Sequence, residues 1–154
     1  EMESFQLAHI IEEAFDVCQP HLGHLNVRIT LPVESVIILG KPRMLRRILD
    51  NILTNAGRYA QTMVEVGCQD LDEKIVITIE DDGPGIPTED RERIFEPFVR
   101  LDQSRSRHSG GFGLGLSIAQ KIARWHGGSL SADKSAMGGA KLCLELPISE
   151  DTQI

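Results

Sequence analysis

The sequence predicts an α+β fold, a two-layer α/β sandwich in which three helices cover one face of a mixed sheet of about five to six strands. Two patterns support this expectation. Apolar residues recur at helical spacing in three separate stretches, and shorter stretches between them alternate apolar and polar residues, as strands do. No internal repeat and no second domain is evident, so residues 1–150 are expected to form one domain and residues 151–154 a disordered tail.

The composition is that of a globular protein with a substantial core. Of the 154 residues, 41% are hydrophobic and 25% are charged. The net charge of −7 disfavours nucleic acid or an anionic membrane as a general partner. Three cysteines without a framework spacing favour a reducing compartment. No apolar run approaches the roughly 20 residues that span a bilayer, and no signal peptide is evident, so a cytoplasmic location is predicted.

The first elements predicted are a helix and a hairpin. Helical periodicity runs from Phe5 to Val17, and Pro20 and Gly23 are expected to end the helix. Period-two alternation predicts strands at Val27 to Leu31 and Val36 to Leu39. Because only a short turn separates these strands, they are expected to pair as a β-hairpin.

A second helix is predicted from Lys41 to Tyr59, with Pro42 in its first turn. Its apolar face consists of Leu45, Ile48, Leu49, Ile52, Leu53 and Ala56. Asn51, Asn55 and Arg58 fall together on another face. Carboxamide oxygens suit a hard cation, and a guanidinium suits phosphate oxygens. Taken alone, this polar stripe is equally consistent with a solvated helix face.

The rest of the chain continues the alternation of strands and helices. Residues 82–113 are too rich in Gly, Pro, Arg and Ser for continuous regular structure. The remaining elements expected are strands at Gln61 to Gln69, Lys74 to Glu80, Ser129 to Asp133 and Ala140 to Leu146, a helical turn near Glu89 to Phe95, and a third helix at Leu114 to His126.

A first glycine-rich stretch, Asp82 to Pro87, follows a buried-looking strand. Gly83 and Gly85 permit a ligand to approach the backbone closely. A carboxylate at a strand end can accept a hydrogen bond from an exocyclic amine such as that of adenine. The alternative is a plain Asp-Gly-Pro-Gly turn.

A second glycine-rich stretch, Gly111 to Gly115, runs into the third helix. Free N–H groups at a helix N-terminus form a phosphate site. Leu116 stands where a Walker loop needs Lys, and the dinucleotide fingerprint does not fit either. A phosphate cradle without Lys needs help from a cation, which the asparagine face of the second helix could hold as Mg²⁺.

The order and spacing of these motifs resemble the N, G1, F and G2 boxes of sensor histidine kinases. The matching runs are Asn51 to Tyr59, Asp82 to Ile86, Phe95 to Phe98 and Gly111 to Gly115. The resemblance extends from about Phe5 to Pro147, and the run from Phe95 to Arg105 resembles the RstB-like sensor kinases most. It implies the Bergerat ATP-binding fold, shared with gyrase, heat-shock-protein-90 and MutL ATPases.

The resemblance also implies roles for individual residues. Asn55 would be the Mg²⁺ ligand, Asn51 a second contact to metal or phosphate, and Arg58 a phosphate contact, so these three are the candidate catalytic residues. Asp82 would receive the adenine amine. The other expected ATP contacts are Tyr59, Gly83, Gly85, Ile86, Arg100, Gly111, Gly113, Leu114, Gly115 and Leu116. Gly57 replaces a larger residue usual in the family, which suggests local crowding or a weak point in the helix.

One position separates a kinase from an ATPase. The hydrolytic relatives carry a general-base Glu where this chain has Asn51, and an amide cannot take a proton from water. The implied function is Mg-ATP binding and γ-phosphoryl donation to a histidine in two-component signal transduction.

None of the five histidines is followed by Glu or Asp, so the acceptor is expected on dimerisation helices upstream of Glu1. The implied parent is an inner-membrane sensor with this domain on its cytoplasmic side, and a response regulator is the further partner. Alternatives are a non-catalytic nucleotide-binding or docking module, an ATPase of the same fold, and an anti-sigma-type serine kinase.

Overall fold

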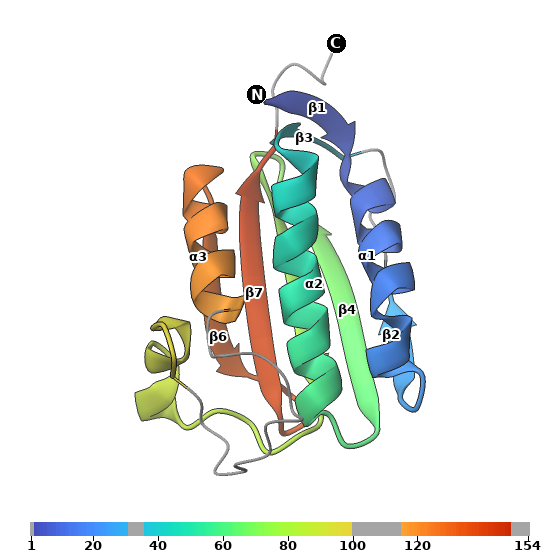
Figure 1. Cartoon of the computed structure of the whole chain (residues 1–154), viewed down its shortest axis with the longest axis vertical. Helices are drawn as coiled ribbons and strands as arrows, with labels where there is room; N and C mark the ends of the chain where they lie inside the picture. Colours follow the sequence, from blue (N-terminus) through green and yellow to red (C-terminus); the bar gives the residue numbers. More distant parts are fainter. Residues whose placement is uncertain (1, 31–35, 100–114, 149–154) are drawn as a thin grey trace.

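Three helices lie on one face of a five-stranded sheet in the computed structural model, which describes residues 2–30, 36–99 and 115–148 (Figure 1). The helices are α1 (Leu7–Leu22), α2 (Pro42–Tyr59) and α3 (Gly115–Trp125). The sheet has the order β2-β4-β5-β7-β6, with β2 and β4 parallel and the other pairs antiparallel. Its strands are β2 (Asn26–Ile29), β4 (Met63–Asp70), β5 (Lys74–Asp81), β6 (Ser129–Lys134) and β7 (Ala140–Pro147). The predicted α+β two-layer sandwich is confirmed.

The core fills the space between α2 and the two central strands. Alternate residues of β5 and β7 point toward the helices, and six apolar residues of α2 are buried against them, as the sequence predicted. Burying each large aliphatic side chain contributes about 1.5–3 kcal/mol. The buried residues are, on β5, Ile75, Ile77 and Ile79; on β7, Leu142, Leu144 and Leu146; and on α2, Leu45, Ile48, Leu49, Ile52, Leu53 and Ala56. This packing fixes the rotation of α2 and leaves its asparagines outside the core.

The first helix begins and ends later than the sequence predicts. Residues Glu3–Gln6 form a strand, β1, and α1 then continues through Pro20 to Leu22. A proline in the last turn removes one backbone hydrogen bond but leaves the rest of the helix intact. The helix ends where the Gly23 N–H donates to the Gln19 carbonyl at 2.8 Å.

The prediction of a hairpin between the strands at Val27 to Leu31 and Val36 to Leu39 is wrong. Strand β3 (Ile37–Gly40) pairs with β1 in a separate two-stranded sheet, with Glu3 opposite Gly40. Strand β2 instead lies parallel to β4, with Asn26 opposite Met63. Closeness in sequence favours a hairpin, but pairing with strands more distant in the sequence replaces it in the folded domain. The turn predicted at 32–35 lies outside the described residues.

The remaining elements agree with the predictions. Strands β4 and β5 form a hairpin whose turn contains Asp72 at φ 70. Between β5 and residue 99 the regular structure is limited to two short 3₁₀ turns, η1 (Thr88–Asp90) and η2 (Arg93–Phe95). Strands β6 and β7 close the sheet as an antiparallel pair. The expected disordered tail at 151–154 lies outside the described residues.

A buried histidine joins the end of α3 to the start of α2. The Lys41 N–H donates to His126 Nε2 at 3.0 Å, and His126 Nδ1–H donates to the Ile122 carbonyl at 2.8 Å. A Cβ on Gly40 would lie 2.4 Å from the His126 ring, so the two segments meet without space for a side chain. This buried histidine, bonded through both ring nitrogens, therefore has a structural role.

Helices α1 and α2 pack closely together at Gly57. A Cβ at this position would lie 2.6 Å from the His21 carbonyl oxygen and 3.2 Å from Leu22 Cδ2. Contacts of real Cβ atoms are almost never this short, and the nearest atom belongs to the backbone. The crowding expected at Gly57 is therefore confirmed.

Replacing Gly57 by alanine should destabilise the domain. Alanine favours a helix by about 1 kcal/mol over glycine, but overpacking against the α1 backbone should produce a net loss of about 1–3 kcal/mol. Urea unfolding measures the change. Arg47→Ala on the exposed face of α2 is the control and should stay within about 0.5 kcal/mol of the parent. A more stable Gly57→Ala variant would contradict this packing.

Candidate functional site

The candidate site residues of α2 lie beside the turn that leaves β5 and near the start of α3 (Figure 1). A Cβ on Gly83 would lie 2.2 Å from the Tyr59 carbonyl oxygen, so the turn touches the end of α2. A Cβ on Gly115 would lie 3.4 Å from Asn51 Oδ1. The structure thus brings together three segments that the sequence analysis selected separately.

Asn51 connects the two helices of the site. Its side-chain Nδ2 donates to the Gly115 carbonyl at 3.0 Å, which ties the middle of α2 to the first residue of α3. A carboxylate at this position could not make this bond, because it has no N–H to donate. Asn51 therefore has a positioning role that its spacing alone did not indicate.

Asn55 and Arg58 are free to meet a ligand. Asn55 is half-buried, and within the described part of the chain its side chain makes no hydrogen bond. Arg58 is exposed, makes no ion pair with another described residue, and has its Cζ 6.0 Å from the ring centroid of Tyr59. An unpartnered carboxamide oxygen suits a hard cation, and an unpaired guanidinium suits a phosphate.

The Asp82 carboxylate is already engaged by the start of β4. It accepts hydrogen bonds from the backbone N–H groups of Gln61 (2.8 Å), Thr62 (3.0 Å) and Met63 (3.1 Å), and from the Thr62 hydroxyl. These bonds, with those of Thr62 strongest, hold the pKa of Asp82 well below its usual range. An adenine amine would have to compete with them, so the geometry disfavours Asp82 as the adenine contact.

Asp81, which the motif spacing did not select, is a second carboxylate beside this turn. It is the last residue of β5, it is 3% exposed, and its Oδ1 accepts the N–H groups of Gly83 (2.9 Å) and Ala140 (3.2 Å). Its other oxygen has no hydrogen-bond partner among the described residues. Burial raises the pKa of this carboxyl, although both backbone bonds oppose the rise. The register of β5 could have revealed it, because Asp81 continues the inward-facing series of isoleucines.

Glycines make the close packing around Asp81 possible. A Cβ on Gly139 would lie 2.2 Å from the Asp81 carbonyl oxygen and 2.3 Å from its Oδ1. Gly85 has φ +80, a conformation that other residues rarely adopt. Ile86 follows it, half-buried and packed against the core. The turn therefore exposes backbone and one apolar side chain beside a buried carboxylate, an arrangement that fits a flat base carrying an amine.

The second glycine stretch is described only at its end. Gly115 and Leu116 lie half-buried in the first turn of α3, beside Asn51. The other predicted contacts of this stretch, Arg100, Gly111, Gly113 and Leu114, lie outside the described residues. Within the described part of the chain, no cluster of three or more His, Cys, Asp or Glu residues could hold a metal ion.

Comparison with known proteins shows the family. Residues 40–150 match the model of the family described as histidine kinase-, DNA gyrase B-, and HSP90-like ATPase. The chain belongs to this ATPase family. It is 46% identical to the sensor histidine kinase CpxA of Escherichia coli K12 over 123 residues, which is 80% of this chain and 27% of CpxA. It is 45% identical to the sensor protein RstB of the same strain, over 80% of this chain and 28% of RstB.

Solved structures of this ATPase family share the fold. The mycobacterial sensor histidine kinase MprB superposes with a TM-score of 0.85 at 25% identity, covering 96% of this chain and 98% of that one. The ATP-binding domain of PrrB from Mycobacterium tuberculosis gives 0.78 at 28% identity, covering 97% and 99%. The chain spans only about a quarter of the length of CpxA and RstB. Among the described residues, no helix is long and apolar enough to cross a membrane.

The two neighbouring aspartates should affect the pH dependence of stability in opposite directions. Because the folded-state pKa of Asp82 is lowered, its stabilising contribution is present above the ordinary carboxyl pKa of about 3.9 and is lost as pH falls toward the folded-state value. Because the folded-state pKa of Asp81 is raised, its ionisation opposes folding, and stability should fall as pH rises through that value.

Urea unfolding from about pH 3 to about pH 8 tests both directions. Asp82→Asn should flatten the loss of stability on the acid side, and Asp81→Asn should remove the fall that accompanies rising pH. An acid limb that Asp82→Asn leaves unchanged would contradict the hydrogen bonding described here.

Proposed function

We propose that this chain binds Mg-ATP and donates its γ-phosphoryl group to a histidine on a separate dimerisation domain, in two-component signal transduction. The observation that carries the proposal is that this fold holds both a buried Asp81, one of whose oxygens lacks a hydrogen-bond partner among the described residues, and a half-buried Asn55 that makes no hydrogen bond with them. The sensor-kinase relatives at 46% and 45% identity support it.

Asp81 takes the role that the sequence analysis gave to Asp82. Its free carboxylate oxygen accepts the exocyclic amine of adenine, while its other oxygen remains bonded to the Gly83 and Ala140 N–H groups. Gly83 and Gly85 let the base approach the backbone, and Ile86 supplies an apolar contact. Tyr59, half-buried at the end of α2, borders the same space.

The α2 residues meet the triphosphate. Asn55 provides the protein oxygen for Mg²⁺, and Arg58 faces the phosphates. The bound ion would neutralise phosphate charge during transfer. Asn51 holds the first residue of α3 through the Gly115 carbonyl, and so orients the N–H groups at the start of that helix toward the phosphates. Its own contact to metal or phosphate, if made, uses Oδ1.

Asn51 also favours phosphoryl transfer over hydrolysis. A carboxamide does not act as a general base, and this one already donates to a carbonyl. The acceptor is a histidine outside this chain, on dimerisation helices of a sensor kinase, and a response regulator then receives the phosphoryl group. On this proposal the domain works on the cytoplasmic side of a membrane-bound sensor.

Asn55→Ala should abolish the Mg²⁺ dependence of ATP binding and lower the phosphotransfer rate at least about 100-fold, since metal contributes several kcal/mol to transfer and 1.4 kcal/mol is tenfold. Calorimetry with ATP, with and without Mg²⁺, measures the first effect. Labelled ATP and a sensor-kinase dimerisation domain supplied in trans measure the second.

Asn26→Ala is the matched control, because the Asn26 side chain is exposed on the edge strand β2 and is not among the proposed ligand contacts. It should leave both quantities unchanged. Full Mg²⁺ dependence and transfer in Asn55→Ala, with the fold intact by urea unfolding, would refute the metal assignment.

A further inference from the structure

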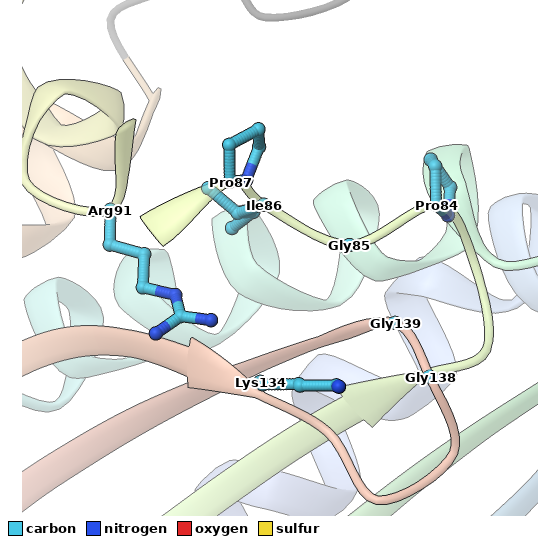
Figure 2. A pocket seen from close by; sticks show the side chains of 8 residues that line it. All are labelled: Pro84, Gly85, Ile86, Pro87, Arg91, Lys134, Gly138 and Gly139. Carbon is cyan, nitrogen blue, oxygen red and sulfur yellow. The ribbon is translucent and has the colours of Figure 1, made fainter. Parts of the chain in front are cut away.

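A pocket of about 200 Å³ lies between the turn after β5 and the turn that joins β6 to β7 (Figure 2). It is lined by Pro84, Gly85, Ile86, Pro87, Arg91, Lys134, Gly138 and Gly139. Gly85 and Ile86 are shared with the proposed nucleotide site. The lining contains no residue of α2 and no aspartate, so it lacks the residues proposed above to meet the phosphates and the adenine amine.

Arg91 brings an unsatisfied donor to this pocket. Its Nε is buried and has no hydrogen-bond partner among the residues that the structure describes. Leaving a buried donor unpaired costs about 1–3 kcal/mol, and more for a charged group, so such atoms in folded proteins call for an explanation. Its Nη1 lies 3.6 Å from Asp133 Oδ1, a loose ion pair to a carboxylate whose side chain is 66% exposed. That pair leaves the guanidinium edge formed by Nε and Nη2 without an acceptor among the described residues.

Lys134 adds a second cation. It is the last residue of β6, it is exposed, and it makes no ion pair with any described residue. Figure 2 shows the Arg91 side chain pointing from the turn toward the β6–β7 hairpin, where Lys134 lies. Two carboxylates of this region have other partners: Glu80 accepts a hydrogen bond from the Ser135 hydroxyl at 2.9 Å, and Asp133 pairs with Arg91. Two cations thus line a pocket in a chain of net charge −7.

We propose that this pocket binds a small oxyanion, a phosphate or a carboxylate, held by Arg91 and Lys134. A guanidinium edge matches two oxygens of either group, and a charge-assisted bond of this kind is about twice as strong as a neutral one. At Gly138 an added Cβ would meet nothing within 4 Å, so the backbone here is open to a small anion. The volume is below the roughly 300–1,000 Å³ of sites for larger ligands, so the pocket suits a small group.

Nuclear magnetic resonance of the nucleotide-free chain tests the proposal. Inorganic phosphate and acetate are titrated separately at constant ionic strength, so that the two anion chemistries are distinguished. Saturable shifts are expected for the Gly85, Gly138 and Gly139 amides and for the Arg91 Nε–H. Because nucleotide is absent, failure here would leave the proposed kinase function unaffected.

Variants at the pocket sharpen the test. Arg91→Gln should weaken anion binding at least about tenfold, and Lys134→Gln, an exposed change that should not affect folding, about threefold or more. Asp133→Asn should tighten binding, because it removes the carboxylate that competes for Arg91. Arg93→Gln is the matched control, since Arg93 is an exposed arginine of the same loop that pairs with Asp90 at 2.9 Å, and it should bind as the parent does.

Three results would overturn the proposal. The first is linear, non-saturating shifts that are the same in the parent and in Lys134→Gln. The second is an anion affinity that Arg91→Gln and Arg93→Gln change equally. The third is complete displacement of the anion by ATP in strict competition, which would make the pocket part of the nucleotide site. Simultaneous binding of ATP and anion would support a separate site.

Discussion

The site depends on a carboxylate buried at the end of β5. Asp81 carries a desolvation cost, which shows in its raised pKa, and two backbone N–H groups from the next turn and from β7 partly offset that cost. Gly139 has to lack a side chain for these bonds to form, and Gly83 has to lack one where the turn meets the end of α2. One acidic group therefore joins the turn to β7, and its other oxygen has no partner among the described residues.

Helix α2 is held in place by the sheet and by hydrogen bonds to α3 and the residue that follows it. Its apolar face is held by the sheet, its start is bonded to His126 at the end of α3, and its middle is bonded through Asn51 to the start of α3. Hydrogen bonds at both ends of α3 therefore connect it to α2. Such a frame can hold Asn55 and Arg58 in place while neither makes a hydrogen bond or ion pair of its own among the described residues. Rigid support for unpartnered polar groups is what a preorganised binding site requires.

Local pattern predicted most of this structure, and long-range packing decided the rest. The α2 face, the β4–β5 and β6–β7 pairs and the two-layer arrangement follow from periodicity, because one face of each element must be buried. The partner of β2 could not be read this way, since an edge strand pairs with whichever neighbour the core places beside it. The site showed the same division. Spacing selected the Asp-Gly-Pro-Gly turn, but only the inward register of β5 separates Asp81 from Asp82.

The affinity of the chain for ATP in Asp81→Asn and Asp82→Asn tests the central claim most directly. Losing a charged hydrogen bond costs about 1.5–3 kcal/mol, so Asp81→Asn should raise the Kd for ATP by about tenfold or more, whereas Asp82→Asn should change it by less than about threefold. Calorimetry near neutral pH, with urea unfolding to confirm that both variants are folded, gives the comparison. A large loss of affinity in Asp82→Asn with none in Asp81→Asn would show that the adenine amine meets the other aspartate and would contradict the account.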